Sequence, residues 1–268
     1  MFPNFNCTNL CSLYYSYYLS PSKIINVKLS LSFSFPPVFA ILFLPLLSSC
    51  VADCGPSDGE SPITKAITVG EFQSVDLTTD CKIIITEAQG QKVEIRGYQK
   101  AIDNLEFKVK DGILTINDER NCNNDGKVPE ISITIPVVRD LSVSGSGEIK
   151  TTNTLAADDH KLEVSGSGRI VADLNSKTLK SEVSGSGTLT LKGNSVSADH
   201  EISGSGSIRA FELLTANAKV EVSGSGNAEV SVNGTLKADV AGSGNVKYKG
   251  NPEVKQELSG SGSVTKVE

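Results

Sequence analysis

The chain of 268 residues contains no tryptophan, and aromatic residues make up only 6% of it. Scarce aromatics argue against a sugar-binding platform, because such surfaces stack apolar sugar faces on aromatic rings. Basic residues are also outnumbered, since 25 Lys and Arg against 31 Asp and Glu give a net charge of −6. No basic patch with interleaved aromatics is present, so we expect no nucleic-acid partner.

No long apolar run is available for a membrane-spanning helix in the mature protein. Val38–Leu47 has only ten residues and contains Pro45, whereas a spanning helix needs roughly 20 apolar residues. The run has the layout of a secretion signal, and Leu47-Ser48-Ser49-Cys50 looks like a lipobox, in which the cysteine is lipidated. We therefore predict a signal peptide region over residues 1–49, lipidation at Cys50 and a polar tether over residues 50–62.

Residues 1–26 differ in composition from everything that follows, since they hold four of the six tyrosines. Val27 is followed by Lys28, which suits the charged start of a signal peptide. We expect translation to start at Val27, with residues 1–26 included through a mis-assigned start.

Three cysteines remain after the predicted lipidation site: Cys54, Cys81 and Cys122. Cys81 and Cys122 flank predicted strands and could form a disulfide in an oxidising compartment, which would leave Cys54 unpaired in the tether. Spacing does not determine connectivity, so this pairing is one of several that the sequence allows.

The sequence Ser-Gly-Ser-Gly recurs along the second half of the chain. The tetrads begin at Ser144, Ser165, Ser184, Ser203, Ser223 and Ser259, with Ala241–Gly244 as a variant. Successive starts are 21, 19, 19, 20, 18 and 18 residues apart. A repeat of this length is too short for two packed helices, and it indicates a solenoid whose coils bury their apolar faces by stacking.

Each repeat places an aliphatic residue directly before the tetrad and an apolar residue five positions after its start, as Val183 and Leu189 do. This pattern favours two strands per coil, with glycines at a tight corner. Leu155, Leu174, Leu213 and Leu236 supply a third inward contact, and the serine hydroxyls are expected to form ladders. We predict a single-domain, all-β, right-handed parallel β-helix with coils of about 19 residues over residues 141–268.

Charged residues also recur at fixed offsets from the tetrads. The residue two positions before is acidic in six successive repeats, and the residue four positions before is lysine in five: Glu163, Glu182, Glu201, Glu221, Asp239 and Glu257, beside Lys161, Lys180, Lys219, Lys237 and Lys255. Positions two apart share one face of a strand, so parallel acidic and basic columns are expected on the outer surface. Stacked carboxylates resemble a retaining glycosidase pair, but the neighbouring lysines favour a structural role.

Sequence signals for catalysis are missing. The two histidines, His160 and His200, fall in different coils about two rungs apart, near 10 Å, and we expect each at a corner or on the surface. No catalytic triad order, zinc spacing or cofactor fingerprint is visible, and the tetrads lack the Asp of calcium-binding rolls. We therefore predict no enzymatic activity, no catalytic residues, no metal and no cofactor.

Residues 63–140 alternate apolar and polar residues without repeating. Six segments read as strands: 72–77, 83–85, 93–95, 105–109, 113–116 and 131–135. Their spacing of about ten residues matches half a coil, so we interpret this region as irregular first coils that cap the solenoid.

The order of these motifs resembles the auto-transporter adhesin head (GIN) domain family of Bacteroidetes surface lipoproteins. The likeness covers residues 70–265 and rests on the lipobox, Phe72-x-x-Val75, Gly112–Ile116, and Ile131-x-Ile133-x-Ile135-Pro136 leading through Leu141–Val143 to the first tetrad. It implies a β-helix-like fold and a place in the bacterial envelope, and it supplies no catalytic residues.

Two classes of function follow. The first is a non-enzymatic, lipid-anchored outer-membrane protein, either a surface adhesin or a scaffold, with a protein or polysaccharide as its ligand. The alternative is a carbohydrate-binding module or a polysaccharide-active β-helix enzyme. We also expect the C-terminal coil to offer unpaired backbone groups, so that self-association through this end becomes possible.

Overall fold

The computed structural model describes residues 60–118 and 127–268. The chain divides into two compact units, residues 1–48 and residues 49–268. The first unit lies outside the described residues, so the fold below is that of the second.

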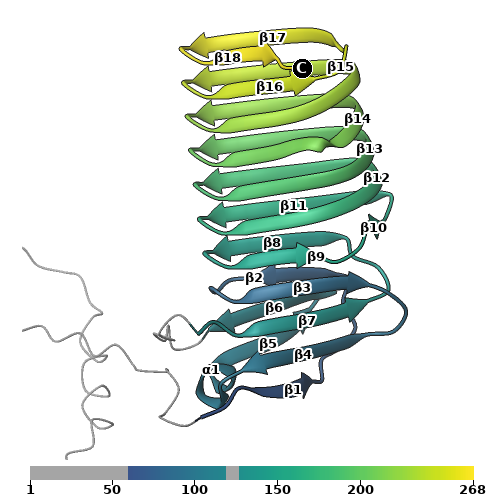
Figure 1. The fold of residues 1–268 in the computed structure, drawn as a ribbon, viewed down its shortest axis with the longest axis vertical. Coiled ribbons are helices and arrows are strands. Elements are labelled where there is room, and N and C mark those ends of the chain that lie inside the picture. Colours follow the sequence, from purple (N-terminus) through teal and green to yellow (C-terminus); the bar gives the residue numbers. More distant parts are fainter. Residues whose placement is uncertain (1–59, 119–126) are drawn as a thin grey trace, which may run out of the picture. The chain divides into compact units, whose positions relative to one another are not determined.

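The second unit is a parallel β-solenoid of about seven turns, each of roughly 19 residues (Figure 1). Equivalent residues pair from coil to coil: Val164 with Val183, Val183 with Ile202, and Ile202 with Val222. This confirms the predicted parallel solenoid. Its strands are β8 (Asp140–Gly145), β9 (Glu148–Thr151), β10 (Leu155–Ala156), β11 (Asp159–Gly166), β12 (Arg169–Gly185), β13 (Thr188–Gly204), β14 (Ser207–Gly224), β15 (Asn227–Gly242), β16 (Asn245–Lys249), β17 (Glu253–Gly260) and β18 (Ser263–Lys266).

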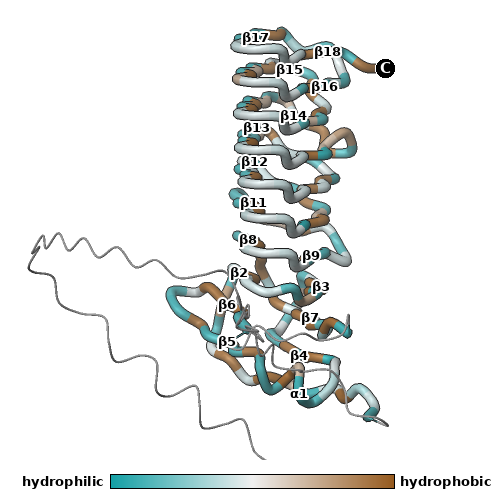
Figure 2. Tube along the Cα trace, turned by 90° about the vertical axis from the view of Figure 1, so that its left-hand side faces the viewer, coloured by the Kyte–Doolittle hydropathy of each residue, from teal (hydrophilic) through white to brown (hydrophobic). Residues whose placement is uncertain are grey.

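The tetrads form one edge of the solenoid, where every strand from β11 to β15 ends and the next begins. In Figure 2 this edge faces the viewer, and the tetrads form a pale band in each coil. From the second tetrad on, the first glycine has a positive φ, for example 109° at Gly185. A Cβ at Gly185 would lie 2.8 Å from the carbonyl oxygen of Gly166 in the preceding coil. Only glycine therefore fits this corner.

The second glycine of a tetrad is needed because of crowding. A Cβ at Gly168 would lie 2.5 Å from Cγ1 of Val143 and 2.8 Å from the carbonyl oxygen of Gly147. The backbone also joins the corners, since the amide of Ser186 donates to the carbonyl of Gly166 over 2.8 Å. Both glycines thus allow successive coils to approach at sheet spacing.

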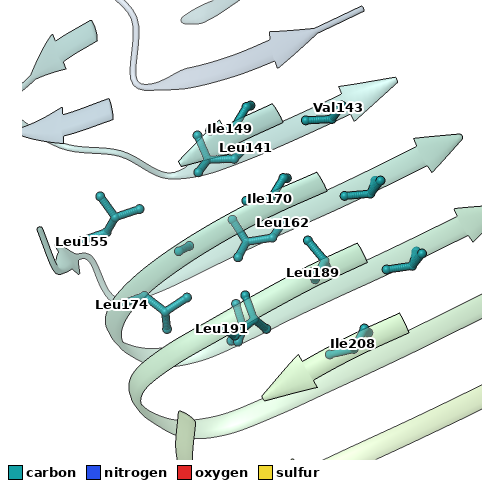
Figure 3. Packing of buried hydrophobic residues seen from close by; sticks show 14 of the residues in the cluster. Leu141, Val143, Ile149, Leu155, Leu162, Ile170, Leu174, Leu189, Leu191 and Ile208 are labelled. Atoms are coloured by element: carbon teal, nitrogen blue, oxygen red, sulfur yellow. The ribbon is translucent and has the colours of Figure 1, made fainter. Parts of the chain in front are cut away.

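The core consists of aliphatic side chains stacked in columns between the strands of each coil (Figure 3). The columns predicted before and after the tetrads are buried, as Val183 and Leu189 show, with 1% and 0% exposure. The four leucines expected as a third inward contact are also buried. A hydrophobic interior of stacked equivalent positions supplies most of the driving force for folding.

The first coil of the solenoid comes from the irregular region. Strands β2 (Ser74–Leu77) and β3 (Lys82–Glu87) pair in parallel with β8 and β9. The predicted strands of residues 72–135 are therefore present, and this pair behaves as an extra coil beneath the repeats.

The remaining strands of the cap are partly antiparallel. β4 (Lys92–Gly97) pairs antiparallel with both β1 (Ile63–Ile67) and β7 (Glu130–Ile135), and β5 (Leu105–Lys110) pairs antiparallel with β6 (Ile113–Asp118). The β5–β6 hairpin turns at Asp111-Gly112, where both residues have positive φ, as a tight hairpin requires. A short helix, α1 (Gln99–Asp103), buries Ala101 and Ile102 against this end.

Candidate binding surfaces

The predicted charge columns are present on the outer face of one sheet. Glu163, Glu182 and Glu201 are register partners on successive strands β11, β12 and β13, and the acidic column continues through Glu221, Asp239 and Glu257. The lysines two positions earlier form a second column in the same register. Side chains of opposite charge therefore lie side by side along the solenoid.

Most of these charges are paired within their own coil. The Lys219 ammonium lies 2.7 Å from the Glu221 carboxylate, and the Lys237 ammonium lies 2.9 Å from that of Asp239. Lys161 contacts both Glu163 and Glu182, at 2.9 and 3.7 Å, and so joins two coils. The charges are thus neutralised locally, as a solvated sheet face requires.

The pKa shifts on this face follow from the same pairs. The hydrogen bond donated by Lys180 holds the pKa of the Glu182 carboxyl below its usual value. A hydrogen bond to Glu182 likewise raises the pKa of the Lys180 ammonium. A general acid in a glycosidase needs a raised carboxyl pKa, so this shift has the wrong direction for that role.

The pairing changes toward the C-terminal coils. Asp199 interrupts the lysine column, and in the described part of the chain neither Glu201 nor Glu257 forms an ion pair. Lys255 instead lies 3.5 Å from Glu253. A groove of about 580 Å³ lies along the acidic column here, and its other wall carries the exposed first residues of the tetrads: Ser203, Ser223, Ala241 and Ser259.

The opposite sheet carries a ladder of amides and hydroxyls. The Asn245 amide donates to the Asn227 side-chain oxygen over 3.2 Å, and the Ser263 hydroxyl donates to Asn245 over 2.7 Å. A groove of about 340 Å³ runs beside this ladder and is lined also by Arg209, Glu229 and Lys247. This face is therefore polar and mixed in charge.

The expected serine ladder at the tetrads does not form. Their hydroxyls are exposed, and among the described residues no hydrogen bond joins them from coil to coil. The coils are linked there by backbone bonds alone, because the glycine corners leave the short serine side chains directed to solvent.

The expectation for the histidines was wrong, because both are buried. His160 is 3% exposed and His200 is 0% exposed. They lie in two further inward columns, where Leu179 and Leu162 occupy the equivalent positions in other coils. Leu236, which was expected with Leu155, Leu174 and Leu213, continues the His160 column instead. Nδ1 of His200 lies 2.5 Å from the Ser181 hydroxyl, and burial lowers the pKa of His200 to about 4.

Of the predicted site residues, only Cys81 lies within the described part of the chain. It is a buried free thiol, and burial raises its pKa to about 12. Cys50, the predicted lipidation site, and Cys122, the predicted disulfide partner, lie outside the described residues. Lipidation and the Cys81–Cys122 disulfide therefore stay predictions.

The described residues include neither a metal-binding cluster nor a membrane-spanning helix. No cluster of histidine, cysteine and carboxylate side chains there could hold a metal ion. No described helix has the length and apolar character needed to cross a membrane.

A regular solenoid with long polar columns and short corners belongs to the class of proteins that present an extended surface. The chain matches the family described as "Putative auto-transporter adhesin, head GIN domain" over residues 71–252, and it belongs to that family. This confirms the resemblance inferred from the tetrads and the strands before them. No curated protein matches the chain.

Several solved structures share the fold. A putative adhesin from Bacteroides fragilis is 25% identical with a TM-score of 0.73, covering 80% of this chain and 99% of its own. A putative adhesin from Parabacteroides distasonis is 26% identical with a TM-score of 0.63, covering 80% and 100%. A protein from the same species described as a putative lipid binding protein is 21% identical with a TM-score of 0.65, covering 79% and 98%.

Proposed function

We propose that the protein is a non-enzymatic adhesin on the bacterial cell surface, held in the outer membrane by lipid on Cys50. Membership of a putative adhesin family and the fold shared with putative adhesins support this proposal. The observation that carries it is the outer charged face, whose columns continue in register from β11 to β17. A partner protein or polysaccharide would meet many equivalent groups along this face, and such multivalency raises avidity without any strong single contact.

Two observations favour binding over catalysis. Corner turns at the tetrads are short, so no long loop of the described coils folds over the acidic groove. Most carboxylates along the column are also neutralised by lysine. A catalytic carboxylate pair needs two different environments that separate its pKa values.

The unpaired carboxylates of the groove provide a test of the binding face. Replacing both Glu201 and Glu257 with lysine should reduce adherence of cells carrying the protein to an epithelial cell layer at least fivefold. The control reverses Glu212 and Glu268, which are exposed and line neither groove. Equal adherence of the two double variants, with both proteins folded, would remove the charged face from the mechanism.

The anchor is tested separately. Cys50→Ala should leave the chain without lipid and should release it from the membrane fraction, whereas Cys54→Ala should retain both. Membrane retention of Cys50→Ala, together with no lipid on the wild-type protein by mass spectrometry, would contradict the proposal. Protease accessibility on intact cells distinguishes an exposed adhesin, which is cleaved, from a periplasmic scaffold, which is protected.

A second candidate is carbohydrate binding through the opposite sheet. The Asn227–Asn245–Ser263 ladder beside a groove favours it, because amides and hydroxyls pair well with sugar hydroxyls. Binding of a polysaccharide on a glycan array that is lost in Asn227→Ala and kept in the Glu201 and Glu257 double variant would select this candidate. The reverse pattern would select the charged face.

A further inference from the structure

A small surface at one corner of the cap combines apolar residues with a tyrosine and a lysine. We call this surface the cap corner and define it as Ile63, Tyr98, Lys127 and Val128. Three contacts bring these residues together. Ile63 at the start of β1 is the register partner of Gly97 at the end of β4. A Cβ on Gly97 would lie 3.3 Å from Pro129, the residue after Val128, and the Lys127 ammonium lies 5.2 Å from the centre of the Tyr98 ring.

The cap corner exposes apolar side chains beside a tyrosine and a lysine. Ile63 is 39% exposed and Val128 is 40% exposed, and both are among the six large hydrophobic residues that the described chain exposes. Figure 1 shows the start of β1, the end of β4 and α1 together at the end of the solenoid away from the C-terminus. Single exposed apolar residues are common, but two flanked by Tyr and Lys match the side chains that favour membrane interfaces.

Two basic residues belong to this corner. Lys127 is part of it, and Lys65 lies two residues after Ile63 on the same face of β1. Arg96 is the register partner of Thr64 and Glu130, so it points to the other face of the sheet. The carboxylates on that other face are paired, since Glu130 lies 3.6 Å from Lys82 and Glu94 lies 2.7 Å from Lys92. Each basic residue beside an anionic membrane strengthens binding by about fivefold.

The position of the corner in the chain identifies its occupant. Ile63 directly follows residues 50–62, the tether that joins the fold to the proposed lipid on Cys50. Even fully extended, thirteen residues reach only about 45 Å, so β1 stays close to the bilayer. Later coils extend away from the cap along the solenoid (Figure 1).

We propose that the cap corner contacts the headgroup region of the anchoring membrane and binds anionic lipid there. Ile63 and Val128 enter the boundary between headgroups and acyl chains, while Lys127 and Lys65 meet lipid phosphates. This contact fixes the direction in which the solenoid leaves the membrane. The inference rests on the proposed lipid anchor and is independent of the adhesin ligand.

The absence of tryptophan makes the test direct, because any introduced tryptophan is the only one in the protein. The lipidated full-length variant Val128→Trp is reconstituted into vesicles of phosphatidylethanolamine and phosphatidylglycerol that carry brominated acyl chains. The matched control is Val196→Trp in β13, where the native side chain is 57% exposed. We expect bromine to quench the indole fluorescence of Val128→Trp at least twofold more than that of Val196→Trp, and equal quenching would overturn the proposal.

A charge variant distinguishes lipid contact from simple proximity. Lys127→Glu in the Val128→Trp background should at least halve the quenching in vesicles with phosphatidylglycerol and should have little effect without it. Lys237→Glu on the solenoid should change neither value. Quenching that is insensitive to Lys127→Glu would refute the binding of anionic lipid. Mass spectrometry of Cys50 separates the two hypotheses, because lipid on Cys50 with an unquenched tryptophan at position 128 rejects only the membrane contact.

Discussion

At the scale of single residues, the first glycine of a tetrad, such as Gly185, combines two constraints that act separately at Gly90 and at the second tetrad glycine, Gly187. Gly185 has a φ of 109° and also faces a carbonyl oxygen 2.8 Å from the position of a Cβ. Gly90 has a φ of 86° with nothing within 4 Å, whereas Gly187 is crowded by Val164 without a left-handed φ. These three positions allow backbone strain and crowding to be measured independently.

We expect Gly90→Ala and Gly187→Ala each to lower the free energy of unfolding by about 1–3 kcal/mol, from strain and overpacking respectively. Gly185→Ala should lower it by about the sum of the two. Ser186→Ala should cost about 1 kcal/mol or less, since its exposed hydroxyl forms no ladder. Urea denaturation measures all four, and a serine variant as damaging as Gly185→Ala would show that the corner is misinterpreted.

The buried His200 makes stability depend on pH. Its pKa is about 4 in the fold and 6.5 when unfolded, so only the unfolded chain gains this proton as the pH falls below 6.5. The contribution of His200 to the free energy of unfolding is fully present above pH 6.5 and is lost progressively as the pH falls toward 4. Between pH 7 and pH 5 the loss should be about 2 kcal/mol.

The double variant Ser181→Ala with His200→Val should abolish most of this dependence. Valine suits the column, because Val220 is the register partner of His200 in the next coil. Replacing Ser181 as well avoids leaving its hydroxyl buried without a partner. Urea titrations of both proteins at pH 7 and pH 5 provide the measurement, and an unchanged pH dependence in the variant would place the responsible group elsewhere.

Whether the burial of a residue could be predicted from the sequence depended on whether its column is apolar in every coil. The positions beside the tetrads are aliphatic in nearly every coil, so Val183 and Leu189 were identified from the pattern. The column that contains Leu162, Ser181 and His200 alternates in polarity between coils, which hid its inward direction. A single histidine in a sequence is more often exposed than fully buried. The burial of His200 therefore becomes evident only from the residues above and below it in the column.

At the scale of elements, each coil is a unit that begins and ends at the same place. Deleting residues 184–202 would join Val183 to Ser203 and would remove one full coil of 19 residues. Because β12 and β14 offer the same register to a neighbour, we expect the shortened protein to keep its far-ultraviolet circular dichroism per residue. Its stability should fall through the loss of one interface between coils.

The matched control deletes residues 185–202, which is one residue fewer. It would leave a coil of 20 residues, a length that already occurs between Ser203 and Ser223, but the extra serine would stand directly before the glycine corner. The register shifts between β13, β14 and β15 all lie away from the tetrads, so an extra residue at the corner would put either the strand that ends at Val183 or the corner itself out of register. We expect this protein to be less stable than the one that lacks residues 184–202. If both deletions fold equally well, then the coils are not held in register by the alternation described above.

The cap was predicted less completely than the coils. Its strands were located because they alternate, but alternation is the same for parallel and antiparallel neighbours. The antiparallel pairing of β1, β4 and β7 depends on contacts between segments more than 25 residues apart, which leave no local pattern. The helix α1 is also too short to show a helical period.

At the scale of the whole described unit, the last coil differs from the others in exposure. Leu258 on β17 continues the inward column of Val222 and Val240, yet it is 47% exposed. In the part of the chain that the structure describes, β17 pairs only with β15, and β18 pairs only with β16. Strand edges of this kind favour pairing with another chain.

We therefore expect concentration-dependent self-association through β17 and β18. Leu258→Glu should shift sedimentation velocity profiles toward the monomer, because a carboxylate would be buried at the contact. Val196→Glu adds the same charge at an exposed site on another edge and should have no effect. A wild-type protein that stays monomeric at high concentration would contradict the expectation.

The glycine corners also determine where this architecture can acquire new sequence. Register shifts between β13, β14 and β15 occur at Thr190/Lys192, Ala210/Leu214 and Thr215/Asn217, all away from the tetrads. Neighbouring coils therefore differ in length away from the tetrads, whereas the glycine corners have no room even for the methyl group of an alanine. Proteins that evolve from this architecture can lengthen the loops on the edge away from the tetrads but not those at the tetrads. The tetrad edge is therefore expected to stay constant within such a family, while the other edge varies. Peptides inserted for display should follow the same rule and be accepted beside Leu214 but not beside Gly204.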